Sequence, residues 1–205
     1  MLAGIDKKEV VFTWMSFGLR DFYISFELED ANKWHAYSTF FCHQGLEKIC
    51  KAYLIGTESV HYEKLERSKA LEEINQIAKK HNHGLRELLE SLQSRNVVSK
   101  IQISRKVDGY AGSELIQILD NAYLESRYPI PNPTYKKYPI STGKKSSRMY
   151  HVPIGETAPI KYARDLAGVV VKKIFADFSV PIKLSDRISN EDWIRFCRLF
   201  QFGSL

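Results

Sequence analysis

The longest helical pattern in the chain covers residues 34–55 (WHAYSTFFCHQGLEKICKAYLI), where apolar residues recur every three or four positions and no proline occurs. Its one glycine, Gly45, costs a helix about 1 kcal/mol against alanine, which indicates that a neighbouring backbone comes close there. The polar face groups four side chains, Gln44, Glu47, Lys48 and Lys51. A helix this apolar needs at least two others to bury it, so the pattern predicts an all-α bundle built around residues 34–55.

Six further segments are predicted to be helical. Residues 7–28 alternate in part like a strand, but no second strand-like run follows with which they could pair, so a helix is the better prediction. The others are 59–80, which is highly charged, and 84–93, 113–127, 156–178 and 190–202. Residues 95–110 fit a short extended piece or a turn of helix equally well.

Three residues are predicted to mark helix ends. Asp30 is expected to cap the start of the helix at residues 34–55, and Gly56 is expected to end it. Ser113 is expected to cap the helix at 113–127.

The 205 residues suffice for one well-buried domain, expected over 7–180, with a tail helix in 181–205 that docks on the bundle or on a partner. No apolar run approaches the length of a membrane span, and the first residues carry charges where a secretory signal needs an apolar core. The sequence therefore predicts a cytoplasmic protein that does not enter a membrane. The cysteines Cys42, Cys50 and Cys197 are expected to be reduced packing residues.

The net charge of +6 arises from one segment, because residues 126–155 contain six Lys or Arg and no acid. Five prolines between 129 and 153 predict a long basic loop at 130–155. Basic and aromatic side chains alternate in this loop, as is typical of proteins that bind single-stranded nucleic acid. The positive charges would contact phosphates, and the aromatic rings would stack on nucleobases. A solvated loop with no binding role fits the composition equally well. The candidate nucleic-acid-binding residues are Tyr135, Lys136, Lys137, Tyr138, Lys144, Lys145 and Arg148.

Four segments, in this order along the chain, resemble the motifs of the HEPN domain, a helical module often found beside nucleotidyltransferases. Trp14 with Arg20-Asp21-Phe22 resembles the tryptophan and RDL of the first helix of that family. Residues 44–52 (QGLEKICKA) are similar to the Q-x-x-E-K-x-x-K-A of the second helix, and residues 83–89 (HGLRELL) to the H-x-L-x-x-L of the third. Tyr123 with residues 127–129 (RYP) resembles the end of the fourth.

The resemblance covers residues 10–178 and implies a HEPN-like up-and-down bundle, in which 59–80 is an inserted helix and 190–202 an extra C-terminal helix. Ribonucleases of this family carry R-x(4–6)-H, and no arginine of this chain is followed by a histidine at that spacing. The resemblance therefore implies a non-catalytic, dimeric module that binds RNA or a nucleotide and works with a nucleotidyltransferase.

Two alternative functions remain. One is a metal-independent ribonuclease of the toxin or phage-defence kind, in which Arg127 and a non-adjacent histidine, His83 or His151, supply the acid–base chemistry. The other is a structural oligomerisation domain with the tail helix as its interface.

The candidate ligand-binding residues are Gln44, Glu47, Lys48, Lys51, Arg127 and Tyr128. As a binding site, Glu47 orients Lys48 or Arg127 toward a phosphate. If these residues have only a structural role, Glu47 forms an ion pair with Lys51, four residues later in the same helix, or with Arg127 of a neighbouring helix. No Cys, Asp or Glu cluster near His81 and His83 in the sequence could complete a metal site with them, so no metal and no cofactor is expected.

Overall fold

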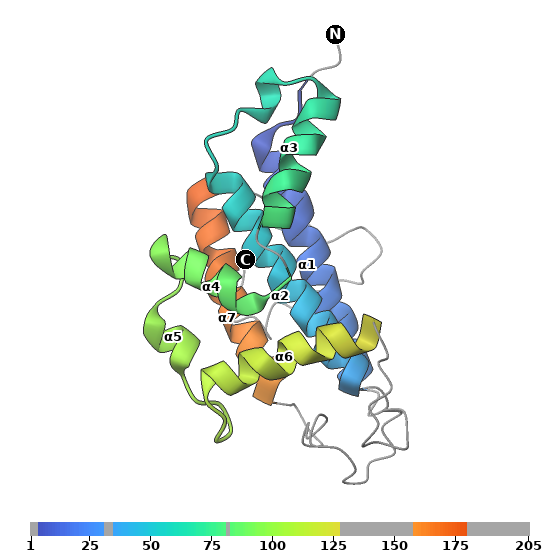
Figure 1. Cartoon of the computed structure of the whole chain (residues 1–205), viewed down its shortest axis with the longest axis vertical. Helices are drawn as coiled ribbons and strands as arrows, with labels where there is room; N and C mark the ends of the chain where they lie inside the picture. The colour runs from blue at the N-terminus through green and yellow to red at the C-terminus, as the bar shows by residue number, and fades with distance from the viewer. Residues whose placement is uncertain (1–3, 31–34, 81–82, 128–157, 180–205) are drawn as a thin grey trace.

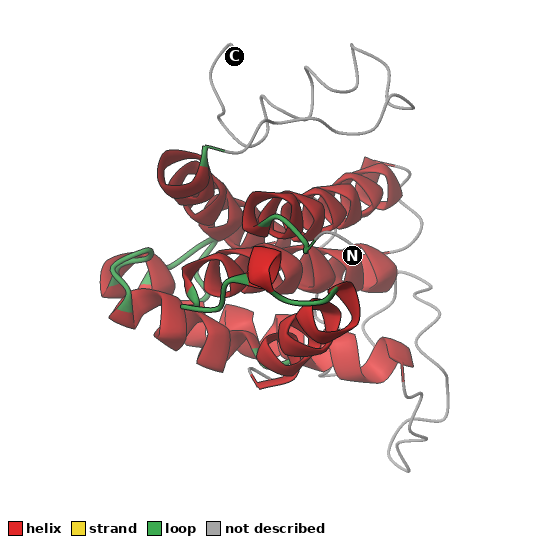
Figure 2. Ribbon diagram, turned by 90° about the horizontal axis from the view of Figure 1, so that it is seen from above, coloured by secondary structure: helices red, strands yellow, loops and turns green. Residues whose placement is uncertain are grey.

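The computed structural model describes residues 4–30, 35–80, 83–127 and 158–179. The side chains of residues 29–30, 35–36 and 124–127 lie outside this description. The described part of the chain is helical with short loops between the helices (Figure 2), and its one pair of bridged residues is Val107 and Tyr110. The prediction of an all-α bundle is therefore confirmed.

Seven α-helices and one short 3₁₀-helix make up the described chain (Figure 1). They are α1 (Lys7–Asp30), α2 (His35–Thr57), η1 (Tyr62–Lys64), α3 (Arg67–Lys80), α4 (Leu85–Ser94), α5 (Lys100–Ser104), α6 (Gly112–Arg127) and α7 (Ala158–Phe178). The predicted loop at 130–155 and the predicted tail helix at 190–202 lie outside the described residues.

Helix α2 is the centre of the bundle, because it contacts α1, α3, α4, α6 and α7. Its apolar face is fully buried at Cys42, Leu46, Ile49, Cys50 and Leu54. A Cβ added at Gly56, near the end of α2, would lie 2.8 Å from Val11 Cγ2 and 2.6 Å from Phe178 Cζ. The end of α2 therefore meets the start of α1 and the end of α7, so α2 runs antiparallel to α1 and parallel to α7 (Figure 1).

Helices α1 and α2 approach each other closely at two glycines. A Cβ added at Gly45 would lie 2.9 Å from the carbonyl oxygen of Gly18 and 2.6 Å from Phe22 Cδ2. A Cβ added at Gly18 would lie 2.8 Å from the carbonyl oxygen of Gly45. The prediction that a backbone comes close to Gly45 is confirmed.

Helix α6 crosses the long helices obliquely at one end of the bundle, and α5 lies between α4 and the start of α6 (Figure 1). Side chains join α5 and the residues just after it to α7. The Tyr162 hydroxyl of α7 donates to the Ile103 carbonyl of α5 at 2.6 Å. Beyond α5, Arg105 pairs with Asp165, and Asp108 pairs with Lys161 at 3.2 Å. Residues 95–110 thus contain the predicted turn of helix at α5 and, beyond it, the bridge at 107–110.

The predicted helix at 59–80 is too long, because α3 begins only at Arg67. The reason is Tyr62, which is completely buried in a second apolar cluster with Ile55, Ala70 and Ile74. Its hydroxyl donates to the carbonyl of Ile55 at 3.4 Å. This burial holds residues 62–64 in a 3₁₀ turn that is separate from α3.

The three predicted helix ends differ from the structure. Gly56 lies inside α2, which ends at Thr57. Asp30 is the last residue of α1, while α2 begins at His35, so it does not cap α2. Ser113 lies inside α6, where Glu114 instead accepts a hydrogen bond of 2.7 Å from the backbone amide of Ala111. In the described part of the chain, no helix is both long enough and apolar enough to cross a membrane.

Candidate functional site

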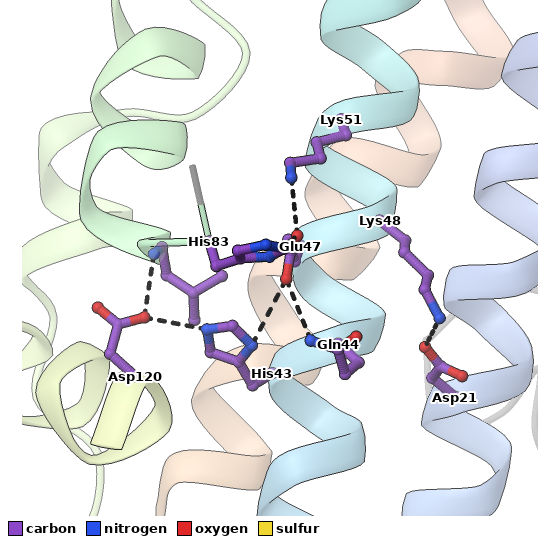
Figure 3. A network of polar contacts seen from close by, with 9 residues as sticks. Asp21, His43, Gln44, Glu47, Lys48, Lys51, His83 and Asp120 are labelled. Atoms are coloured by element: carbon purple, nitrogen blue, oxygen red, sulfur yellow. Dashed lines mark hydrogen bonds and ion pairs between the residues drawn. The ribbon is translucent and has the colours of Figure 1, made fainter. Parts of the chain in front are cut away.

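The carboxylate of Glu47 is the centre of a buried polar network (Figure 3). Its Oε1 atom accepts a hydrogen bond from Lys51 Nζ at 2.8 Å and lies 2.9 Å from Nδ1 of His83. Its Oε2 atom accepts from the side-chain amide of Gln44 at 3.1 Å. Because an ionised carboxylate can only accept, the contact with His83 places a proton on Nδ1 of that imidazole.

Helical spacing accounts for part of this network. Gln44 and Lys51 lie three residues before and four residues after Glu47, so α2 presents all three side chains on one face. His83 lies in the connection before α4 and reaches the same carboxylate from outside the helix. Glu47 and Lys51 are both buried, so each is the other's charge partner.

A second carboxylate, that of Asp120 on α6, holds the start of α4. Its Oδ1 atom accepts a hydrogen bond from the backbone amide of Leu85 at 3.0 Å and lies 3.0 Å from Nε2 of His43. His43 is fully buried, and its Nδ1 atom is 3.8 Å from Glu47 Oε2, which is too long for a hydrogen bond. His43 therefore lies between the two carboxylates (Figure 3). The start of α4 is tied to α2 through His83 and to α6 through Leu85.

Aromatic rings pack beside these acids. The ring of Tyr123 on α6 stacks with the imidazole of His43, with centroids 4.8 Å apart, and with that of His83, with centroids 5.0 Å apart. Phe40 lies 6.2 Å from Tyr123 with nearly parallel planes. Tyr123 and His43 are buried, whereas the side chain of His83 is 57% exposed.

Lys48 belongs to a different contact. It donates to the Asp21 carboxylate of α1 at 2.5 Å, and it points toward α1 on the other side of α2 from His83 (Figure 3). Burial raises the pKa of the Asp21 carboxyl, and the hydrogen bond and charge of Lys48 lower it in part. The predicted group of four polar residues on α2 is therefore divided: Lys48 contacts α1, whereas Gln44, Glu47 and Lys51 contact one another and His83.

The predicted structural pair of Glu47 and Lys51 is present. The predicted meeting of Glu47, Lys48 and Arg127 is not complete, because Lys48 pairs with Asp21 of α1. The part that concerns Arg127 stays a prediction: α2 and α6 are in contact, and Arg127 is the last residue of α6, but its side chain lies outside the described part of the chain. The same holds for the remaining candidate residues beyond α6, which are Tyr128, Tyr135, Lys136, Lys137, Tyr138, Lys144, Lys145, Arg148 and His151.

Sequence reasoning did not identify His43, Asp120 or the stacking role of Tyr123. His43 could have been found, because it precedes Glu47 by four residues and so shares its face of α2. Asp120 carries no such signal, since it lies 77 residues from its partner His43. In the described part of the chain, no three His, Cys, Asp or Glu side chains are grouped so that they could hold a metal ion.

Comparison of the chain with protein-family models, with curated proteins and with solved structures found no match.

Proposed function

We propose that the chain is a non-catalytic, HEPN-like module that binds RNA or a nucleotide, and that it acts as a dimer together with a nucleotidyltransferase. The observation that supports this proposal is that residues from all four HEPN-like segments take part in two neighbouring groups of contacts. Asp21 of the first segment meets Lys48 of the second. Glu47 of the second meets His83 of the third, whose imidazole stacks on Tyr123 of the fourth.

These contacts join segments that lie far apart in the sequence, since His83 is 36 residues from Glu47. A buried ion pair such as that of Glu47 and Lys51 contributes little net stability compared with apolar side chains of similar volume. Stability therefore gives no reason for a charged pair to stand at these two positions in place of an apolar pair, although loss of one charge alone is costly. Orientation of an exposed imidazole does give such a reason, because a fixed polar ring is what a ligand-binding surface needs.

The charge distribution supports a polyanionic ligand. All six excess positive charges fall in residues 126–155, a segment that begins three residues after Tyr123 and includes Arg127, the last residue of α6. Lysine and arginine neutralise phosphates, and the resulting affinity falls as salt rises, because bound counterions are released. The four lysines Lys136, Lys137, Lys144 and Lys145 are proposed to contact the phosphates.

The test is binding of the full chain to a fluorescently labelled single-stranded RNA and to nucleotides, measured by anisotropy at several salt concentrations. Changing the four loop lysines to glutamine is expected to reduce the slope of log affinity against log salt by about 0.7 for each phosphate that the protein no longer neutralises. The matched control changes four exposed lysines of α3 and α5 to glutamine, namely Lys69, Lys79, Lys80 and Lys100. The control loses the same charge and is expected to keep most of the slope.

The results separate two conclusions. If the unmodified chain binds neither RNA nor nucleotide, the proposed function is wrong. If the chain binds but the loop variant has the same affinity and slope as the control, the ligand contacts another surface and the role of the loop is rejected.

A second candidate function, a ribonuclease, is favoured by the geometry of His83. Its Nδ1 atom is held by the buried Glu47 carboxylate and its side chain is exposed, and a base oriented by an acid in this way can exchange protons with a substrate. The test is incubation with labelled RNA between about pH 5 and pH 9, with the unmodified chain, His83→Ala and Arg127→Ala. Cleavage that both variants lose would favour the ribonuclease, and no cleavage across this range would remove it.

A further inference from the structure

The imidazole of His83 is an exposed ring whose position is fixed along one edge and one face. Its Nδ1 edge is 2.9 Å from the Glu47 carboxylate, and its plane is inclined by 24° to the ring of Tyr123, with centroids 5.0 Å apart. Both supports are themselves held in place. Glu47 accepts hydrogen bonds from Lys51 and Gln44, and the side chain of Tyr123 is buried, with 4% exposure. More than half of the His83 side chain nevertheless faces solvent.

His61 shows that this arrangement is more than an exposed histidine near an acid. Its Nδ1 atom also lies 3.0 Å from a carboxylate, that of Glu63, and its side chain is 63% exposed. However, Glu63 is itself half exposed, and among the described residues no aromatic ring stacks on His61. His61 is therefore held at one edge by an exposed partner, while His83 is held at one edge by a buried partner and on one face by a ring before any ligand arrives.

We propose that His83 is a stacking platform for one nucleobase, belonging to a free nucleotide or to single-stranded RNA. This inference rests on the proposed function and names a residue of the described chain that contacts the ligand. Nucleobases that are not stacked in a helix bind to protein by packing on aromatic side chains, histidine included. A base packed on the exposed side of His83 would add a ring to an aromatic group in which Phe40, His43 and His83 each stack with Tyr123.

The surroundings of His83 suit a base better than an apolar ring. Gln44 and His83 contact the two oxygens of the same carboxylate, so the Gln44 amide lies beside the platform and is oriented by Glu47 (Figure 3). A side-chain amide can bond the polar edge of a base while the imidazole contacts its face. The net charge of +6 favours a ligand that also carries phosphate.

The experiment uses the full chain and two fluorescent probes whose emission is quenched on stacking: 2-aminopurine riboside monophosphate, and a short single-stranded RNA with one 2-aminopurine. Three variants are compared with the unmodified chain. His83→Ala removes the ring, His83→Phe keeps an aromatic plane without the nitrogen atoms, and His61→Ala removes the control histidine. Thermal unfolding followed by circular dichroism verifies that each variant is folded.

His83→Ala is expected to weaken binding by about 5- to 150-fold and to abolish the quenching, because the base then has no ring on which to stack. His83→Phe is expected to bind within about threefold of the unmodified chain, and His61→Ala to bind equally well. Quenching of the monophosphate would identify a free nucleotide as sufficient, while quenching in the RNA alone would identify a base of a strand.

Other outcomes overturn the platform. If the probes bind and His83→Ala has no effect, the base stacks elsewhere, and the proposed RNA or nucleotide binding still stands. If His83→Phe loses as much affinity as His83→Ala, the imidazole acts through its nitrogen atoms and not through stacking. If the unmodified chain binds neither probe nor other RNA, the proposed function fails and the platform fails with it.

Discussion

Glu47 and Lys51 form an ion pair in which each side chain is nearly inaccessible to solvent. Removing water from two charges is costly, and the mutual attraction offsets that cost only when further hydrogen bonds satisfy the remaining polar atoms. Glu47 meets this condition through Gln44 and His83. At the scale of single residues, the network is therefore sensitive to the loss of either charge.

Glu47→Gln is expected to lower the free energy of unfolding by about 3 to 5 kcal/mol, because it leaves the buried ammonium of Lys51 without an ionised partner. Urea denaturation measures this change. The matched control is Glu63→Gln, which removes the exposed carboxylate beside His61 and is expected to leave the unfolding midpoint unchanged. The double variant Glu47→Gln/Lys51→Met is expected to recover much of the loss, and equal stability of the single and double variants would contradict this explanation.

Asp21 gives the protein a pH dependence of opposite sign to that of an ordinary salt bridge. Burial raises the pKa of its carboxyl above the usual 3.8, so the folded chain binds this proton more tightly than the unfolded chain. Well below pH 3.8 both the folded and the unfolded chain hold the proton, so Asp21 does not lower the free energy of unfolding. As the pH rises through the raised pKa, the folded carboxyl must ionise in a buried place, and stability falls.

Asp21→Asn is therefore expected to gain stability relative to the unmodified chain as the pH rises from about 4 to about 7. Urea denaturation of both proteins at the two pH values tests this. Lys48→Met should make the fall steeper, because it removes the hydrogen bond that lowers the pKa of Asp21 in part. An Asn variant that instead loses relative stability over this range would mean that the ionised contact with Lys48 dominates.

At the scale of elements, the contact of α1 with α2 depends on Gly18 and Gly45. Each glycine leaves room for the carbonyl oxygen of the other, so the two backbones approach more closely than side chains would allow. This contact sets the position of α1 along α2, because it occurs at one place on each helix.

Gly45→Ala is expected to destabilise the protein by about 1 to 2 kcal/mol in net terms, although alanine favours a helix by about 1 kcal/mol. The added methyl would lie 2.6 Å from Phe22 Cδ2 and 2.9 Å from the Gly18 oxygen, which forces the helices apart. The control is Gly84→Ala, where no atom lies within 4 Å of the added Cβ. It is expected to change the free energy of unfolding by less than about 0.5 kcal/mol, measured in the same urea series.

Helix positions followed from the sequence because hydrophobic spacing is a local property. The central helix, the close approach at Gly45 and the pair of Glu47 with Lys51 were all predicted from residues within one or two turns. The helix at 59–80 was placed wrongly at its start, since the burial of Tyr62 against Ile55 and α3 decides it. Contacts such as His43 with Asp120 join distant residues and leave no local pattern.

At the scale of the whole molecule, the proposed dimer predicts the mass of the protein in solution. Light scattering of the full chain is expected to give twice 23.7 kDa. Deleting residues 186–205 is expected to leave that dimer intact if the bundle provides the interface. A monomer after deletion would favour the alternative in which the tail helix joins the subunits, and a monomeric full chain would reject the dimer.

The order of helices along the chain has a consequence for synthesis. The apolar face of α2 is covered on one side by α1, which precedes it, and on another by α7, which begins only at Ala158. At about 5 to 20 residues per second, a growing chain needs roughly 5 to 20 s to make the intervening roughly 100 residues. Until then α2 remains without its parallel neighbour, so the nascent protein passes through an interval in which chaperones can bind it and aggregation competes with folding.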